Sequence, residues 1–294
     1  MSGAVAEAVA GVRKLRRAEF PELLREIHDP PRVLYLRGAG EVELLARPAV
    51  AIVGARACSP YGSQVARMLG RELAAAGLVV VSGLARGVDG EAHRGALDAE
   101  GLTVAVLGCG IDRDYPAAHA DLARRICERG LVVSEYEPGV EPAPWRFPAR
   151  NRIIAGLTAA TVIVEARERS GALITADFAL EDGREVFAVP GEITGSLAAG
   201  TNRLLRQGAT PLTSAADVLE VFGVGVGPAV QPPALGETAA RVLDRLAESS
   251  ATADELARAT GFQAGPLSAA LTELELAGLV LEADGRYRGV RPPN

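Results

Sequence analysis

Cysteine, histidine and lysine are scarce in this chain of 294 residues, and the first two scarcities each exclude a class of site. The three cysteines, Cys58, Cys109 and Cys127, are odd in number and share no C-x-x-C spacing, which argues against a disulfide framework and against a zinc site. The three histidines have no metal-ligand spacing, and the sequence contains neither a G-x-S-x-G elbow nor a phosphate-binding P-loop. We therefore expect no bound metal and no catalytic residues.

Long apolar runs are also lacking. No stretch approaches the roughly 18 uncharged apolar residues that a membrane span requires, and the N-terminus has no apolar core of the signal-peptide type. With 48% hydrophobic residues, the chain can form one large core and a small second domain. We expect a globular, cytoplasmic protein without a membrane span.

Positive charge is carried almost entirely by arginine, because Lys14 is the only lysine among 31 basic residues. Arginine suits planar, bidentate recognition of phosphate, although a GC-rich coding bias explains the same composition. The net charge of −6 lacks the basic excess that is usual for nucleic-acid binders. It does not exclude that function, because acidic residues can gather away from a binding face.

Short apolar runs bounded by glycine or proline alternate with helical patterns along most of the chain. The expected strands are Val33–Leu36, Val50–Val53, Leu78–Val81, Thr103–Leu107, Leu131–Val133, Thr161–Glu165, Glu185–Val189 and, more weakly, Thr210–Thr213. The expected helices are Tyr61–Ala76, Gly90–Glu100, Ala118–Arg129, Asn151–Leu157, Ile174–Asp182 and Asn202–Gln207. Doubly buried strands that alternate with helices indicate an α/β fold with an extended Rossmann-like, doubly wound, mostly parallel sheet. Ligands of such sheets bind at the carboxyl ends of the strands.

Composition also divides the chain into parts. Residues 1–32 are interpreted as an N-terminal helical lead-in, and residues 33–222 as the Rossmann-like domain. The Gly/Pro-rich residues 223–236 are predicted to be a linker. Residues 237–291 contain three helical patterns and an Asp284-Gly285 hairpin turn, which together predict a small C-terminal winged-helix domain. Its expected helices are Glu237–Glu248, Thr252–Thr260 and Pro266–Ala277.

The loop at residues 82–87 is the clearest candidate binding site. Ser82, Gly83 and Gly87 let backbone N–H groups approach a ligand just before a helix, whose positive dipole end favours an anion. Arg86 adds a full positive charge there. Asp89 is interpreted as the cap of this helix rather than as a catalytic acid.

Comparable turns follow several other strands. The full set of candidate anion-binding residues is Gly54, Arg56, Ser82, Gly83, Leu84, Ala85, Arg86, Gly87, Gly108, Gly110, Arg150, Asn151, Arg152, Ser170, Gly171 and Thr175. The segment 150–152 is expected to begin a helix, and Trp145 and Phe147 either stack a base or pack under their loop. The turn at residues 108–110 lacks the third glycine of a dinucleotide fingerprint, so no cofactor of that type is expected. Several turns along one sheet edge suit a polyphosphate chain, which favours a single nucleic-acid strand as the ligand.

Four segments together, SGLARGVDGEAHRGAL, SEYEPG, FPARNRIIAGLT and SGALITADFALEDGREVFAVPG, closely resemble the DprA/Smf family, the DNA-processing proteins of bacterial natural transformation. The resemblance implies a homodimer that binds and protects single-stranded DNA and loads the RecA recombinase onto it, without catalytic turnover. A single-strand-binding protein is a further implied partner. Family DNA contacts would fall on Gly54, Arg56 and residues 82–87 and 150–152, whereas His119 stands where the family usually has asparagine. The sterile-α-motif-like N-terminal domain of some relatives is expected to be missing.

The C-terminal winged helix resembles the small terminal domain of some family members. Its expected recognition helix carries Glu273 and Glu275 and neither lysine nor arginine, so we expect a protein-contact or regulatory module. Arg286, Arg288 and Arg291 on the wing leave weak DNA contact open.

Two alternative functions remain, a phosphoribohydrolase-like nucleotide-processing enzyme and a transcription factor built around the winged helix. The enzyme requires a PGG-x-GT-x-x-E loop, and the glutamate that follows Pro190-Gly191 here is out of place.

Overall fold

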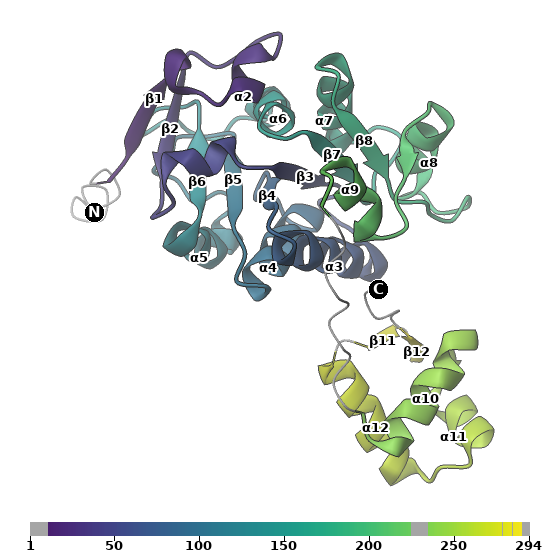
Figure 1. Ribbon diagram of the computed structural model, residues 1–294. Helices are drawn as coiled ribbons and strands as arrows, with labels where there is room; N and C mark the ends of the chain where they lie inside the picture. The colour runs from purple at the N-terminus through teal and green to yellow at the C-terminus, as the bar shows by residue number, and fades with distance from the viewer. Residues whose placement is uncertain (1–10, 225–234, 278, 284, 290–294) are drawn as a thin grey trace. The chain divides into compact units, whose positions relative to one another are not determined.

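Nine of the strands in the described residues form one sheet with the order β1-β2-β6-β5-β4-β3-β7-β8-β9 (Figure 1). The computed structural model describes residues 11–224, 235–277, 279–283 and 285–289. The strands are β1 Arg13–Arg16, β2 Val33–Arg37, β3 Ala49–Val53, β4 Val79–Ser82, β5 Thr103–Leu107, β6 Leu131–Ser134, β7 Ala160–Ile163, β8 Glu185–Ala188 and β9 Thr210–Pro211. From β6 to β9 all neighbours are parallel, and β2 and β1 extend the sheet in antiparallel pairings. The expected Rossmann-like, mostly parallel architecture is confirmed.

The central strands are buried on both faces because their residues alternate between two apolar cores. On β3, Ala51 and Val53 pack into one core, while Val50 and Ile52 pack into the other. The helices are α2 Glu22–Glu26, α3 Pro60–Ala75, α4 Val88–Asp98, α5 Ala120–Arg129, α6 Arg146–Gly156, α7 Gly171–Glu181, α8 Ala199–Arg206 and α9 Ala215–Val221. Helices α3, α4 and α5 cover one face of the sheet, and α6 and α7 cover the other (Figure 1).

The N-terminal lead-in is not simply helical, which corrects the prediction for residues 1–32. Residues 13–16 form strand β1, with Lys14 opposite Tyr35 and Arg16 opposite Val33 of β2. The reason is tertiary: Leu15 is the one residue of this strand that is buried, and it joins the apolar core under the sheet. A single apolar residue among arginines carries no visible period of two, so the local pattern does not reveal the strand.

A second compact unit begins after residue 226. It contains α10 Glu237–Glu248, α11 Ala253–Thr260, α12 Ala264–Leu276 and a sheet of β10 Ala251–Thr252, β12 Arg286–Gly289 and β11 Val280–Ala283. This is the expected winged helix, with β10 added to the expected hairpin. Residues 225–234 of the expected linker, Asp284 of the hairpin turn and Arg291 lie outside the described residues. In the described part of the chain, none of the helices has the length and apolar character needed to cross a membrane.

Candidate nucleic-acid interface

The loops that follow β3 to β8 all leave the same edge of the sheet, because these six strands are parallel. The chain order reverses between β3 and β7, which lie side by side although β4, β5 and β6 separate them in sequence. Such a switch point is where open α/β sheets hold their ligands.

The switch point is filled by a carboxylate of the protein itself. Glu165 follows β7 and is only 6% exposed. Its Oε2 accepts the Ser59 N–H at 2.8 Å, and its Oε1 accepts the Ser59 hydroxyl at 2.5 Å, directly at the start of α3. The Glu165 carbonyl also accepts the Ala55 N–H at 2.8 Å, and a Cβ at Gly62 would overlap the carboxylate. A helix N-terminus attracts an anion, and here Glu165 supplies it.

This arrangement corrects the prediction that the turn at Gly54 and Arg56 forms an open anion cradle. The α3 amino end is already occupied, and Gly54 is packed against Val88 and the Glu165 carbonyl. Arg56, in contrast, is exposed, and its guanidinium carbon lies 5.1 Å from the centre of the Phe147 ring. Arg56 is therefore the part of this turn that remains available to a ligand. Glu165 was missed as a site residue because the sequence places it at the end of an expected strand, where a glutamate carries no motif of its own.

The loop at residues 82–87 is held from inside by Asp89. The Asp89 Oδ2 accepts N–H groups of Gly83 at 3.1 Å and Ala85 at 3.4 Å. Asp89 is the second residue of α4 and not its cap, since the cap position is Gly87 with φ +72° and no side-chain bond. The interpretation of Asp89 as a cap is thus wrong, because the carboxylate turns back to the loop. Leu84 has φ +58° and is fully buried, so the loop presents Arg86 outward rather than a ring of free N–H groups.

Arg150 is a buried side chain that connects the loop after β4 to strand β5 and helix α4, rather than a surface cation. It is 4% exposed, and its Nη1 donates to the carbonyls of Gly83 (2.6 Å) and Val106. Its Nη2 lies 3.9 Å from the Asp89 carboxylate. Burial lowers the pKa of Arg150 to about 10, so the group is still cationic at neutral pH, and burial raises the pKa of Asp89 against the opposing effect of Arg150. With its donors engaged inside the protein, Arg150 supports the loops instead of offering itself to a phosphate.

Asn151 and Arg152 are engaged as well. The Asn151 amide donates to the Gly171 carbonyl at 3.0 Å and its oxygen accepts from Arg150, while Arg152 binds Glu135 through two hydrogen bonds of 2.8 and 2.7 Å. Helix α6 starts at residue 146, so residues 150–152 lie inside it and not at its beginning, which corrects that prediction. The helix extends further because Pro148 falls in its first turn, where a missing N–H is tolerated.

The remaining predicted residues divide into buried and accessible ones. Ser82 is buried and donates its hydroxyl to the Ile52 carbonyl at 2.6 Å, and Thr175 is 1% exposed. Gly108 and Gly110 are buried, with Gly108 packed beneath Phe147. Ser170 caps α7, and Gly171 beside it is exposed with open space where a Cβ would lie. Of this group, only the Ser170-Gly171 turn faces a potential ligand.

Aromatic and arginine side chains gather where the loops after β3, β5 and β6 meet. Tyr115 and Phe147 stack with ring centres 5.3 Å apart, and Tyr115 is 40% exposed. Trp145 is 63% exposed, and the Arg146 guanidinium carbon lies 4.7 Å from its ring centre. An exposed tryptophan is unusual in a chain with 4% aromatic residues. Trp145 and Phe147 were candidates from the sequence, whereas Tyr115 was not among the predicted site residues.

We call this surface the arginine–aromatic edge. It consists of Arg56, Arg86, Tyr115, Trp145, Arg146, Phe147, Arg167 and Arg169. Among the ion pairs of the described residues, none involves these arginines. Cations without carboxylate partners beside exposed rings can bind phosphates and stack bases.

Two buried histidines are engaged internally. His93 is fully buried, with Nδ1 2.7 Å from the Thr103 hydroxyl, and burial lowers its pKa to about 3. His119 lies with Nδ1 2.9 Å from the Leu84 carbonyl and so supports the loop at residues 82–87.

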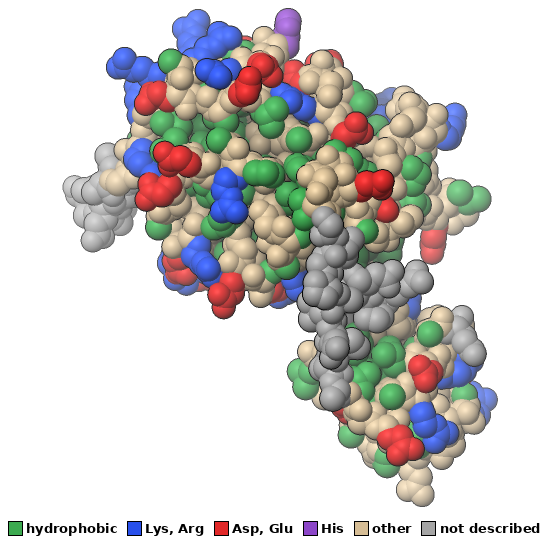
Figure 2. All heavy atoms as spheres, viewed as in Figure 1, with side chains coloured by type: hydrophobic (Ala, Val, Ile, Leu, Met, Phe, Trp, Pro, Cys, Tyr) green, Lys and Arg blue, Asp and Glu red, His purple; other side chains and the backbone are tan. Residues whose placement is uncertain are grey.

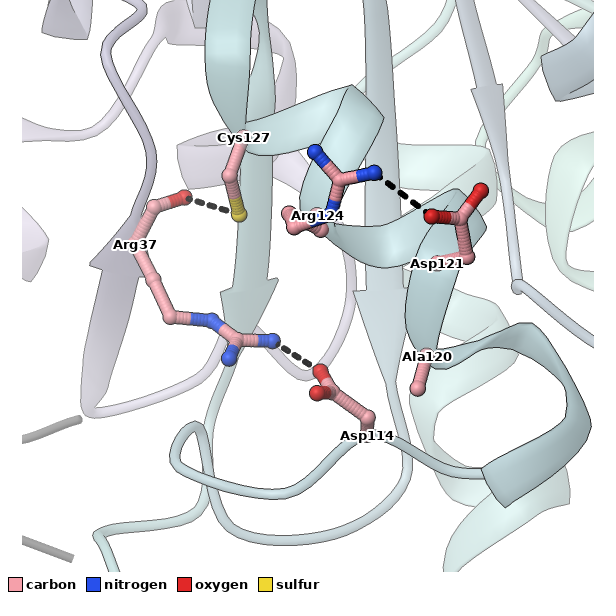
Figure 3. Close-up of a pocket in the computed structure, with 6 residues that line it drawn as sticks. All are labelled: Arg37, Asp114, Ala120, Asp121, Arg124 and Cys127. Carbon is pink, nitrogen blue, oxygen red and sulfur yellow. Dashed lines mark hydrogen bonds and ion pairs between the residues drawn. The ribbon is translucent and has the colours of Figure 1, made fainter. Parts of the chain in front are cut away.

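The hollow shown in Figure 3 does not add to the binding surface. It has a volume of about 530 Å³ and lies beside α5. Both of its arginines point to carboxylates, Arg37 to Asp114 at 2.5 Å and Arg124 to Asp121 at 2.6 Å. Surface arginines already paired in this way have little free charge for a ligand.

Comparisons with known proteins find relatives of both units of the chain. The family model described as DNA recombination-mediator protein A matches residues 12–223, and the DprA winged helix domain matches residues 226–286. A putative DNA processing protein DprA of Mycobacterium tuberculosis is 45% identical over 269 residues, covering 89% of this chain and 69% of its own. The crystal structure of DprA from Streptococcus pneumoniae superposes with a TM-score of 0.69 at 43% identity, covering 73% of this chain and 76% of the other. DprA from Helicobacter pylori, whose structure reports a single-stranded DNA binding mode, gives 0.65 at 33% identity and covers 72% and 95%.

Proposed function

The chain belongs to the DprA/Smf family of DNA-processing proteins, and from that premise we propose that it binds single-stranded DNA along the arginine–aromatic edge and delivers the strand to a RecA recombinase. The single-stranded DNA binding reported for the Helicobacter pylori relative supports the first part. The observation that carries the proposal is the row of exposed arginines without carboxylate partners, interleaved with Tyr115 and Trp145.

The chemistry of this row fits a single strand better than a duplex. Unpaired bases can stack on exposed rings with little dependence on sequence, and each such contact contributes about 1–3 kcal/mol. The guanidinium groups of Arg56 and Arg86 would neutralise phosphates and release counterions. In a duplex the bases are stacked on each other and cannot reach Trp145.

The proposal is one of binding without turnover. Glu165 places a negative charge where a nucleotide phosphate would sit at the switch point, which argues against the phosphoribohydrolase-like alternative. Asp89 and His93, which resemble an acid–base pair in sequence, are instead bonded to the loop backbone and to Thr103.

The proposal retains the further partners that the family implies. These are RecA, a single-strand-binding protein and a second copy of the chain, and the location is the cytoplasm. Three free cysteines are compatible with a reducing compartment. The winged helix is proposed to contact protein, because the exposed face of α12 carries Glu273 and Glu275 and no basic residue.

The test is a competition between single-stranded and duplex DNA for the purified protein at fixed salt. We expect the single strand to win and its affinity to fall as salt is raised. Arg56→Gln should weaken binding about tenfold, since a charged contact contributes about 1.5 kcal/mol. Arg47→Gln, an exposed arginine at the opposite edge of the sheet with no ion pair, is the matched control. Equal binding by wild type and Arg56→Gln would refute the assignment, and preference for duplex DNA would favour the transcription-factor alternative.

A further inference from the structure

A second group of exposed cations lies on the N-terminal hairpin of β1 and β2. Lys14, Arg16, Arg17, Arg25 and Arg32 are all exposed, and the ion pairs of the described residues include none of them. Figure 2 shows basic side chains gathered over the region of β1 and α2. The hairpin holds the one lysine and several arginines within about 20 residues of sequence, a local density that the net charge of −6 conceals.

Strand topology brings this hairpin to the edge from which the binding loops leave. Because β2 runs antiparallel to β6, Tyr35 lies opposite Ser134 at the carboxyl end of β6. Because β1 runs antiparallel to β2, Arg16 lies opposite Val33 at the same end. The row of loops after β3 to β6 therefore continues over β2 and β1. With neighbouring strands about 4.8 Å apart, it reaches about 10 Å beyond β6.

Side chains on one face of the hairpin resemble the arginine–aromatic edge in chemistry. Residues opposite each other on paired strands point to the same face, so Lys14, Arg16 and Tyr35 lie together. The Lys14 ammonium is 5.5 Å from the centre of the Tyr35 ring. The opposite face is used for folding, because Leu15 and Leu34 are buried in the core.

A hollow joins the hairpin to the loop after β6. It has a volume of about 330 Å³ and is lined by Arg32, Tyr35, Glu135, Arg152 and neighbouring residues 29–33. Its two carboxylates do not oppose an anion strongly, since Arg152 binds Glu135 at 2.7 Å and Asp29 at 3.1 Å. Arg32 remains the unpaired charge of the hollow.

We propose that the β1–β2 hairpin, through Lys14, Arg16 and the hollow at Arg32, is a second contact for the phosphate backbone and holds the continuation of a single strand bound on the arginine–aromatic edge. This inference rests on the proposed function. It adds that the binding track extends beyond the parallel part of the sheet. The occupant is the same single strand, because the hairpin shares the sheet edge and offers a ring beside its cations.

The test compares affinities for oligothymidylates of graded length, from about 4 to about 16 nucleotides, a range that brackets the site sizes of single-strand-binding folds. The variant is Lys14→Gln with Arg16→Gln. The control is Arg47→Gln with Arg206→Gln, which removes the same charge at the opposite sheet edge from exposed arginines without ion pairs. We expect equal affinity of the variant and the control for the shortest oligonucleotides, and about tenfold weaker binding by the variant for the longest.

Salt titration gives an independent readout. Each neutralised phosphate of a single strand contributes about 0.7 to the slope of log affinity against log salt. The variant should therefore lower the slope by about 1.4 for long oligonucleotides, whereas the control leaves it unchanged. Arg32→Gln, which lies outside the strands, should give the same length-dependent effect at about half the size.

Three results would overturn the proposal. They are a uniform loss of affinity at all lengths, no difference from the control at any length, and equally strong competition by duplex DNA against the longest strand. Failure of the proposed function looks different, because Arg56→Gln would then leave the affinity for the shortest strands unchanged. Equal thermal midpoints of all variants would show that folding is intact.

Discussion

Replacing Glu165 by glutamine tests whether the switch point is held by the protein's own carboxylate. In the structure the two carboxylate oxygens each accept one hydrogen bond from Ser59, at 2.8 and 2.5 Å. The amide keeps one acceptor and puts an N–H₂ donor in place of the other, so one charge-assisted bond of about 1.5–3 kcal/mol is lost. The favourable interaction of the charge with the start of α3, about 0.3–2 kcal/mol, is lost as well. We expect Glu165→Gln to be destabilised by about 2–4 kcal/mol.

Thermal unfolding is the direct assay of this loss. For a domain of this size 1 kcal/mol corresponds to about 2–4 °C, so the midpoint should fall by about 5–15 °C. Single-strand binding, measured well below both midpoints, should weaken several-fold, because Ser59, three residues after Arg56, loses part of its anchor on the Glu165 carboxylate. A midpoint within about 1 °C of wild type would refute the reasoning.

Glu165→Ala adds a second check. Sulfate should raise the midpoint of this variant more than that of wild type, because the vacated helix end binds an anion. Equal shifts would contradict the role of Glu165 as the anion at the start of α3.

Two further predictions concern buried side chains of helices α6 and α4. Arg150→Met should destabilise the protein by about 3–5 kcal/mol, because it leaves Asp89 buried without its cationic partner. The loss should appear as a lower denaturation midpoint in urea. A loss of stability below about 0.5 kcal/mol, as is usual for a surface residue, would show that Arg150 does not hold these elements together. His93 has a folded-state pKa lowered to about 3, against 6.5 when unfolded, so the unfolded chain binds the extra proton and stability is lost as pH falls below about 6.5. His93→Gln should flatten urea-measured stability between pH 6.5 and 4 relative to wild type, by up to about 1.4 kcal/mol per pH unit, and an unchanged slope would contradict this.

Much of the parallel sheet could be predicted because its signals are local. Apolar runs such as Thr103–Leu107 are short and bounded by glycine, which favours a doubly buried strand over a helix. Strand β1 could not be predicted in this way, because Leu15 is buried only when β1 pairs with β2. The residues around Leu15 give no local signal of that pairing. Tertiary pairing decided that segment, and local propensity did not.

The candidate site was predictable in position but not in the roles of its charges. Loops at strand ends, with glycine and arginine, were correctly located by their sequence. Whether an arginine can bind a ligand or instead stabilises the fold depends on which groups surround it in the structure. Arg56 finds a ring and stays exposed, while Arg150 finds the carbonyls of Gly83 and Val106 and is buried. No spacing within the sequence distinguishes the two.

The carboxylate at the switch point also limits which kinds of ligand such a protein can bind tightly. A mononucleotide depends on one strong phosphate site, and Glu165 closes that site with a charge of the same sign as the ligand. Affinity must then come from many weaker contacts in parallel, because each exposed arginine and ring contributes only a few kcal/mol. Only a ligand with repeated phosphates and bases can use them together. Under the proposed function, the same carboxylate that stabilises α3 would favour a polymer over a single nucleotide.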